Sequence, residues 1–363
     1  MNPLGDAYRQ LDQDTHNYAD AGRALSVLRR RRAGKAALVA GSAAVLVIAG
    51  GIGLQQRLSG PPDVATTLAS PTHVIKPPAT APRLPSAGSV GPGAMVYTAC
   101  RSACPTFLVL QNGQQHVLGE RTVNPPGNIT LSPDGRWLGQ PTTGGYEVRD
   151  LLGGTVHTLQ PPAGGREDSA YSPWAWSADS RRLILGYHAS GDVSAYAELD
   201  LGSGRITKPE LSMGQEPVGV LPSGELLLLD ESQYGKTPLD RVTLKLADSG
   251  RTMVLASEAG VLADADHGLW IQVSGERIFT LAHSGDAVTV LEFDITGKRV
   301  ARMPLLADQY PVGPVADGFA IIQVPQDQRN GHQKLESLSP SGRRLLFEVP
   351  GLASIVLPGA ARH

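Results

Sequence analysis

The chain's two cysteines are the residues best placed for covalent chemistry, because they lie in one short stretch. Cys100 and Cys104 are separated by three residues. In a domain outside the cytoplasm such a pair predicts a disulfide, whose small ring would stabilise the fold by about 2 kcal/mol. A redox-active pair would favour two intervening residues and a helix N-terminus, and a metal site would need further His or Cys ligands nearby. We therefore expect a structural disulfide.

Sequence motifs for nucleophilic or metal-assisted catalysis are absent. The chain contains no Gly-x-Ser-x-Gly, HExxH or P-loop pattern, and its nine histidines are scattered along the sequence. Asp134 and Asp179 lie in short turns and are best interpreted as turn formers. We expect no metal, no cofactor and no enzymatic activity. The alternative is a cryptic hydrolase or lyase whose catalytic groups come from distant parts of the chain.

Aromatic and charged side chains that could bind a protein or a glycan lie in or beside four irregular segments. The segments are 160–171, 187–195, 230–239 and 324–334. Trp, Tyr and Arg are enriched among the residues that dominate binding energy at interfaces. We expect ligand-binding residues among Tyr171, Trp174, His188, Asp192, Tyr234, Lys236, Arg329 and His332. For each of them the alternative is a solvated or half-packed side chain.

Two kinds of turn recur roughly every 45 residues and separate apolar, strand-like runs. The first kind lies at 133–136, 178–181, 222–225, 265–268 and 316–319. The second kind closes at Gly113, Gly154, Gly204, Gly250, Gly297 and Gly342. A repeat of this length with several short strands per period predicts an all-β propeller.

The two series of turns predict six blades and the way in which the ring closes. Each blade is a four-stranded meander, with strands A to D, in which the first kind of turn joins A to B and the second joins C to D. One A–B turn is missing, in the blade around Gly113. The apolar run at 354–357 can supply the missing A strand. We expect a ring that is closed by this C-terminal strand; a seventh, hidden blade is the alternative.

The segments around these turns resemble the repeats of TolB-like and WD40-like propellers. The similar segments are LSPDGRWLG (131–139), AWSADSRRLILG (175–186) and YEVRDLLGGTVHTL (146–159), the last with Arg149 where a Trp is common. The resemblance covers about residues 94–360 and implies a fold rather than an activity. With the N-terminal segments, the chain is similar to membrane-anchored bacterial propellers.

The predicted strand directions sort the connections onto two faces of the ring. The A–B and C–D turns are short and share one face, while the long irregular segments are B–C or D–A connections on the other. Binding residues usually lie in loops on a rigid scaffold, so we expect the ligand on the long-loop face. Trp176 is in phase with an A strand and is expected between blades. The linker would enter at a B strand, which predicts that the tight-turn face points toward the membrane.

The N-terminal part of the chain predicts a membrane anchor. Residues 36–54 are apolar, and they are long enough to cross a bilayer as a helix. The basic residues Arg29, Arg30, Arg31, Arg32 and Lys35 precede them, which predicts a cytoplasmic N-terminus and an extracytoplasmic C-terminal part. We expect a transmembrane helix at 35–54; a cleaved signal peptide and a buried core helix are the alternatives.

The remaining boundaries follow from composition. Residues 1–34 are expected to be a cytoplasmic tail that sets topology; docking onto a cytoplasmic partner is the alternative. Residues 55–93 contain repeated prolines among Ala, Thr and Ser, which predicts a disordered linker. The propeller is expected at 94–363.

Charge and organisation together favour a binding protein. A formal net charge of -2 gives no electrostatic case for nucleic acid. The leading hypothesis is an extracytoplasmic, non-enzymatic binding or scaffold module for a protein or cell-envelope ligand, with a tail that could signal to a cytoplasmic partner. A structural role in envelope assembly and a cryptic hydrolase or lyase are the alternatives.

Overall fold

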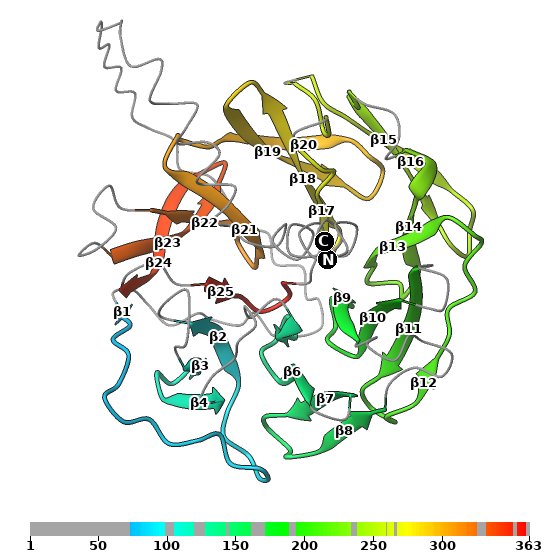
Figure 1. The fold of residues 1–363 in the computed structure, drawn as a ribbon. Helices are drawn as coiled ribbons and strands as arrows, with labels where there is room; N and C mark the ends of the chain where they lie inside the picture. Colours follow the sequence, from blue (N-terminus) through cyan, green and yellow to red (C-terminus); the bar gives the residue numbers. More distant parts are fainter. Residues whose placement is uncertain are drawn as a thin grey trace, which may run out of the picture. The chain divides into compact units, whose positions relative to one another are not determined.

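Five four-stranded sheets and one five-stranded sheet surround a central channel and form a six-bladed β-propeller (Figure 1). The computed structural model describes residues 73–98, 105–119, 128–142, 145–160, 171–188, 194–233, 238–258, 260–264, 267–324, 332–350 and 354–360. Contacts divide the chain into Met1–Ala65 and Thr66–His363, and the propeller belongs to the second unit. The predicted transmembrane helix, the cytoplasmic tail and both cysteines lie outside the described residues.

The blades follow one another along the chain, and each begins with its innermost strand. Blade 1 consists of β25 (Ser354–Val356), β2 (Gly93–Thr98), β3 (Thr106–Leu110) and β4 (Gln115–Gly119). Blade 2 consists of β5 (Thr130–Leu131), β6 (Trp137–Thr142), β7 (Gly145–Asp150) and β8 (Val156–Leu159). Blade 3 consists of β9 (Ser172–Trp176), β10 (Arg182–His188), β11 (Ser194–Asp200) and β12 (Ile206–Thr207).

The second half of the ring has the same arrangement. Blade 4 consists of β13 (Gln215–Val220), β14 (Leu226–Asp230), β15 (Arg241–Leu246) and β16 (Thr252–Ala256), with a 3-10 helix at Glu231–Gln233. Blade 5 consists of β17 (Ile271–Ser274), β18 (Arg277–Ser284), β19 (Ala287–Asp294) and β20 (Arg299–Pro304). Blade 6 consists of β21 (Gln309–Val315), β22 (Gly318–Gln323), β23 (His332–Ser339) and β24 (Gly342–Pro350).

The C-terminal strand closes the ring as predicted. β25 pairs antiparallel with β2, with Val356 opposite Val96 and Ser354 opposite Thr98. It therefore supplies the A strand that the sequence lacks before β2. The six-bladed count is confirmed because the described strands form six separate sheets, each with its own A strand.

One A–B turn was assigned wrongly from the sequence. In blade 5 the turn between the first two strands is the two-residue Gly275-Glu276, with Gly275 at φ 61°. His267 and Gly268, which the sequence placed in this turn, precede β17. The Asp-x-Gly chemistry of 265–268 is that of a turn, but turn chemistry does not say which two elements the turn connects.

The start of the propeller also differs from the expectation. β1 (His73–Val74) pairs in parallel with β24 and adds a fifth strand to blade 6. From there, residues 75–92 run over the outer edge of blade 1 and reach blade 2 before β2 begins (Figure 1, blue). The described part of the expected linker is thus hydrogen-bonded to the propeller.

Core packing joins neighbouring blades as well as strands within a blade. Trp176, at the end of β9, is buried, and its indole N–H donates a hydrogen bond to Thr130 Oγ1 of blade 2 at 2.7 Å. The expectation that Trp176 lies between blades is confirmed. These contacts hold the inner strands in place, and their ends form the site described next.

Candidate functional site

The residues predicted for the long-loop face are only partly available for binding. Tyr171 is 6% exposed and packs edge-on against Tyr187, with ring centroids 5.6 Å apart. Its burial, followed by the proximity of Tyr187, raises the pKa of the phenol. Tyr171 is therefore a buried side chain, and its role in ligand binding stays a prediction. Its place just before β9 directs it into the core between blades 2 and 3.

Trp174 is half-buried, and its ring lies 5.3 Å from that of Tyr196. His332, the first residue of β23, is exposed. The structure does not bring these two residues together in any shared pocket among the described residues. The side chain of His188, and Asp192, Tyr234, Lys236 and Arg329, lie outside the described residues, so their predicted role stays a prediction.

A cavity lined by described residues lies at the opposite, tight-turn end of the channel. Its volume is about 540 Å³, and it is open to solvent at the mouth of the ring. The lining comes from the A–B ends of blades 2, 3, 5 and 6 and from the chain that follows β25. The lining residues are Pro133, Trp176, Ala178, Val273, Ser274, Gly275, Glu276, Arg277, Pro314, Val315, Ala316, Pro358 and Gly359.

These residues converge because of the propeller geometry. All A strands run in the same direction around the channel, so every A strand ends, and every A–B turn begins, at one mouth. Residues far apart in the sequence, such as Pro133, Ala178 and Ala316, thereby line one cavity. The same positions are repeated turns in the sequence, and this repetition is the signal that could locate the cavity. From the sequence alone, the repeated turns indicate only a propeller scaffold.

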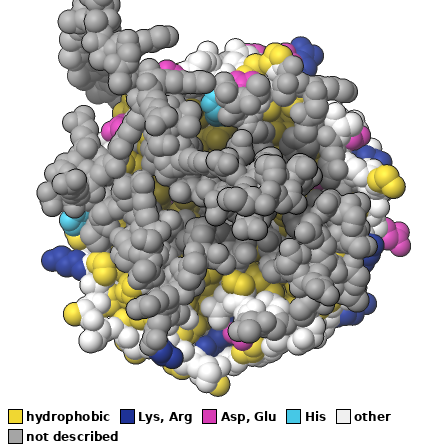
Figure 2. All heavy atoms as spheres, viewed as in Figure 1, with side chains coloured by type: hydrophobic (Ala, Val, Ile, Leu, Met, Phe, Trp, Pro, Cys, Tyr) yellow, Lys and Arg dark blue, Asp and Glu magenta, His cyan; other side chains and the backbone are white. Residues whose placement is uncertain are grey.

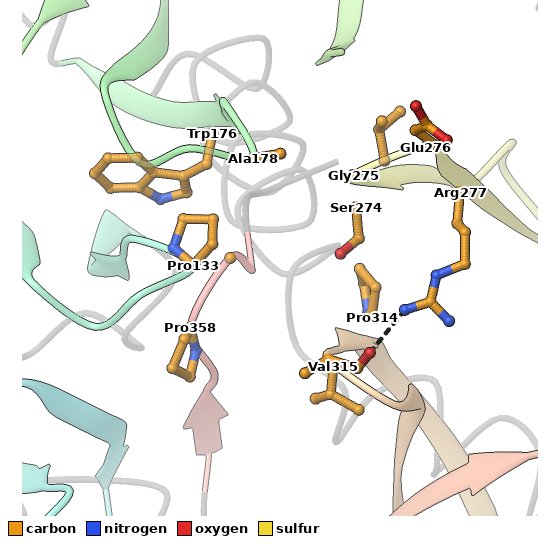
Figure 3. Close-up of a pocket in the computed structure, with 13 residues that line it drawn as sticks. Pro133, Trp176, Ala178, Ser274, Gly275, Glu276, Arg277, Pro314, Val315 and Pro358 are labelled. Carbon is orange, nitrogen blue, oxygen red and sulfur yellow. Dashed lines mark hydrogen bonds between the residues drawn. The ribbon is translucent and has the colours of Figure 1, made fainter. Parts of the chain in front are cut away.

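The cavity wall is mainly apolar, with a polar sector from blade 5. Figure 3 shows Pro133 and Pro358 on one side of the opening, with Pro314 and Val315 across from them. The polar side chains that offer charge or a hydroxyl are Ser274, Glu276 and Arg277. A wall of this kind suits an apolar ligand group whose polar end meets a few fixed donors and acceptors.

Arg277 connects two blades at the rim of the cavity. Its guanidinium donates a hydrogen bond to the Ala316 carbonyl of blade 6 at 2.9 Å and lies 3.5 Å from the carboxylate of Glu292 (Figure 3 draws the first contact). It also lies over the ring of Phe279, 5.6 Å from its centroid. These contacts hold the charge in place, so it can act as a preorganised donor for a ligand.

Two glycines let the inner strand of blade 5 approach its neighbours closely. A Cβ atom on Gly219 of β13 would come within 2.4 Å of the Val273 side chain. One on Gly313 of β21 would come within 2.8 Å of Gln272 Oε1. Both glycines end the same pattern, Gln-x-Pro-Val-Gly, and both follow a register shift. The channel wall is therefore tightly packed on both sides of β17.

The described lining does not form a recognisable catalytic centre. Glu276 is its single carboxylate, and Ser274 has no histidine or second carboxylate beside it in the described cavity. Within the described ranges, no group of three His, Cys, Asp or Glu side chains could hold a metal ion.

A second cluster lies away from the channel mouth, in the connection between blades 4 and 5. The rings of His267 and His283 stack with centroids 4.1 Å apart, and Asp264 Oδ1 lies 2.8 Å from His267 Nδ1. The backbones of Val261 and His283 are paired. Burial, together with the adjacent His267, lowers the pKa of His283 to about 4. The sequence separates these histidines by sixteen positions, so only the fold brings them together.

In the view of Figure 2, the Lys and Arg side chains that can be seen (dark blue) are spaced around the rim, with Asp and Glu side chains (magenta) among them. Several of the arginines are paired, as Arg136 is with Asp150 and Arg182 with Glu198. Among the described residues, no helix has the length and apolar character that a membrane span requires.

Comparison with known proteins gives similarities to solved structures alone. No protein-family model and no curated protein matches the chain. Similar solved structures include TolB from Acinetobacter baumannii, with 16% identity, a TM-score of 0.46, and coverage of 75% of this chain and 65% of that one. A candidate TolB from Agrobacterium tumefaciens has 14% identity and a TM-score of 0.42, and covers 74% of this chain and 99% of that one.

An enzyme is also among the similar solved structures. An oligogalacturonate lyase from Vibrio parahaemolyticus has 9% identity and a TM-score of 0.41, with coverage of 68% of this chain and 71% of that one. The chain spans less than two thirds of the Acinetobacter protein's length. At these scores the similarities carry no argument about function, and the propeller assignment rests on the strand topology.

Proposed function

We propose that this chain is a membrane-anchored, extracytoplasmic propeller that binds a segment of a protein or cell-envelope ligand without transforming it. The observation that carries the proposal is the open cavity of about 540 Å³ at the tight-turn mouth. Its walls come from separate blades of a rigid ring, and they are mainly apolar. Sites of this shape and composition are typical of ligand binding.

The chemistry of the wall defines what such a ligand must offer. The Pro, Ala and Val side chains favour an apolar group, which would lose contact with water on entry. Ser274 and the tethered Arg277 favour a hydrogen-bond acceptor or an anionic group at one side of that apolar group. A cryptic hydrolase or lyase would need a pair of acid–base groups that converge on the cavity, and the described lining offers no such pair.

The direction of β1 supports an orientation for the anchored propeller. β1 runs parallel to β24, which starts at the tight-turn end. β1 therefore runs in the direction that leads away from the tight-turn end. In the proposed arrangement, with the span at 35–54 and the basic residues 29–32 and 35 in the cytoplasm, the cavity faces the membrane. Its ligand would lie close to the outer surface of the bilayer.

Site-specific photocrosslinking in native membranes tests this proposal. A photoreactive amino acid replaces Ala178 in the cavity wall or, as the control, Met213, which is fully exposed outside the cavity. We expect a discrete crosslinked species from position 178 that is missing from position 213. Ser274→Trp, which would fill the cavity, should abolish it. Capture from position 178 that persists in the filled variant would contradict binding in this cavity.

A further inference from the structure

The segment 73–92, called the strap below, is bound along the outer edges of blades 6 and 1 and against blade 2. At its start β1 pairs with β24, and the Ile75 N–H donates to the Glu348 carbonyl at 2.8 Å. The Ile75 side chain is buried in the core cluster that blades 1 and 6 share. The strap therefore begins as part of a sheet and contributes to the core.

Its middle pairs with the outer strand of blade 1. Arg83 and Val117 form a parallel bridge, in which the Leu84 N–H donates to the Val117 carbonyl at 3.0 Å. In return the Val117 N–H donates to the Pro82 carbonyl at 2.9 Å. Through these bonds the strap covers an edge that would otherwise present unpaired backbone groups.

Arg149, on β7 of blade 2, holds the next part of the strap. Its side chain is 3% exposed, and its guanidinium donates hydrogen bonds to the carbonyls of Pro85 and Gly88, the second at 3.0 Å. A buried guanidinium requires acceptors, and those it has are backbone carbonyls of the strap. Gly88 also lies close to Gly154, since a Cβ atom on Gly154 would come within 2.9 Å of the Gly88 nitrogen.

The composition of the strap matches this donor. Its prolines, at 77, 78, 82, 85 and 92, have no N–H, so the segment offers carbonyl acceptors in excess of donors. A cationic side chain with several N–H groups in a fixed fork complements such a backbone. A lysine carries its three donors on one nitrogen, so it lacks the two separate nitrogens with which Arg149 contacts the two carbonyls.

We propose that the edge of blade 6, the edge of blade 1 and Arg149 together form a peptide-binding track, whose occupant is the chain's own strap. Arg149 is the positioning residue that keeps the strap bound. The track recognises an extended, proline-rich segment through backbone pairing at two blades and a charged donor at the third. This inference does not depend on the proposed ligand or on the membrane anchor.

Limited trypsin digestion of the full chain tests this proposal. Trypsin cleaves after Lys and Arg but poorly before a proline. Arg83 is therefore the strap's cleavage site, whereas Lys76 precedes Pro77. We expect cleavage after Arg83 to be at least ~10-fold faster in Arg149→Leu than in the parent chain, since release of the strap exposes this bond. Arg149→Lys should give an intermediate rate. The matched control Arg251→Ala, which removes an exposed arginine from a turn of blade 4, should cleave at the parent rate.

Two further measurements separate strap release from other effects. Hydrogen exchange in β10, β11, β14 and β15 should be unchanged in Arg149→Leu. Equal acceleration there would overturn the proposal, because Arg149 would then support the whole ring. Cleavage of Arg149→Leu at the parent rate would also overturn the proposal. A cleavage rate that rises on dilution of the parent chain would show that a second copy's strap fills the track, which would overturn the assignment of the occupant.

Discussion

Leu131 and Pro358 form a parallel β-bridge that joins the inner strand of blade 2 to the chain just after β25. Beside it, the Gly359 N–H donates to the Leu131 carbonyl at 2.8 Å. Thr130 Oγ1 donates to the Ala360 carbonyl, also at 2.8 Å. The C-terminal segment thus pairs with blade 1 through β25 and with blade 2 through residues 358–360, so it closes the ring across two blades.

Leu357, between these two contacts, is expected to be important for stability. It is 2% exposed, and Leu357→Ala should lower the free energy of unfolding by about 2–4 kcal/mol, because it leaves a cavity at the closure. The matched control Leu306→Ala, at a side chain that is 56% exposed, should lower it by less than about 1 kcal/mol. Urea unfolding monitored by fluorescence measures both. Equal effects would show that the closure contributes little.

Ser180 is the single described non-glycine residue with positive φ, at 58°, where the equivalent turns have Gly135 and Gly224. Its hydroxyl also accepts a hydrogen bond from the Asp134 N–H of blade 2 at 3.2 Å. Ser180→Ala loses this bond and keeps the strain, whereas Ser180→Gly loses the bond and relieves the strain. We expect the alanine variant to be less stable than the glycine variant by about 1 kcal/mol. Thermal unfolding of the pair gives the comparison, and the reverse order would contradict it.

Gly219 allows the close approach of blades 4 and 5. Gly219→Ala would force its Cβ atom against Val273, so we expect a loss of about 1–3 kcal/mol of unfolding free energy. Gly268→Ala is the control, because nothing lies within 4 Å of the position that its methyl group would take and its φ is ordinary. Denaturant midpoints of both variants test the difference. A neutral Gly219→Ala would mean that β13 and β17 can move apart.

Asp150 is held by Arg136 and by the turn that follows β7. Burial raises its pKa, but hydrogen bonds from Arg136 and from the backbone of Gly153 and Leu152 outweigh that effect and leave the pKa below its usual value. Asp150→Asn removes the charge that pairs with Arg136, and we expect a loss of about 1–3 kcal/mol near neutral pH.

Asp240→Asn is the control for this substitution. Asp240 is exposed and lies 4.0 Å from Arg241, so its loss should change stability by less than about 1 kcal/mol. The lowered pKa of Asp150 gives a further check. The ionised Asp150 stabilises the native state at a pH above the usual carboxyl pKa, and this stabilisation is lost as the pH falls through the pKa of Asp150 in the native state. Denaturant unfolding at neutral and acidic pH should therefore show the Asp150→Asn variant and the parent chain converge at low pH.

His283 predicts an acid-sensitive step in stability. An unfolded chain protonates this imidazole below about pH 6.5, but the native state resists until about pH 4, since burial and the adjacent His267 disfavour the charge, although Asp264 partly opposes them. The free energy of unfolding should therefore fall as the pH drops from 6.5 to 4.

We expect His283→Gln to reduce the loss between pH 7 and pH 5 by about 1 kcal/mol, after allowance for the partial exposure of the ring. His332→Gln, at an exposed position, is the matched control substitution. Chemical denaturation at the two pH values measures this. An unchanged slope in His283→Gln would exclude His283 as the cause.

The order and number of blades could be predicted from the sequence because they depend on local chemistry. Asp-Gly and Ser-Gly turns recur between apolar runs of strand length, and each turn largely determines the hairpin that contains it. Even the closing strand at β25 was predictable, since one blade lacked its first strand and one apolar run had no partner. Trp176 followed from its phase in β9.

Contacts between residues far apart in the chain could not be predicted in this way. Turn composition did not distinguish 265–268 from Gly275-Glu276, and proline content did not reveal that Arg149 holds the strap. The burial of Tyr171, the stacking of His267 on His283 and the cavity at the tight-turn mouth depend on how blades pack against one another. Local sequence patterns specify strands and turns, whereas burial, pKa and cavities arise from distant side chains that exclude water together.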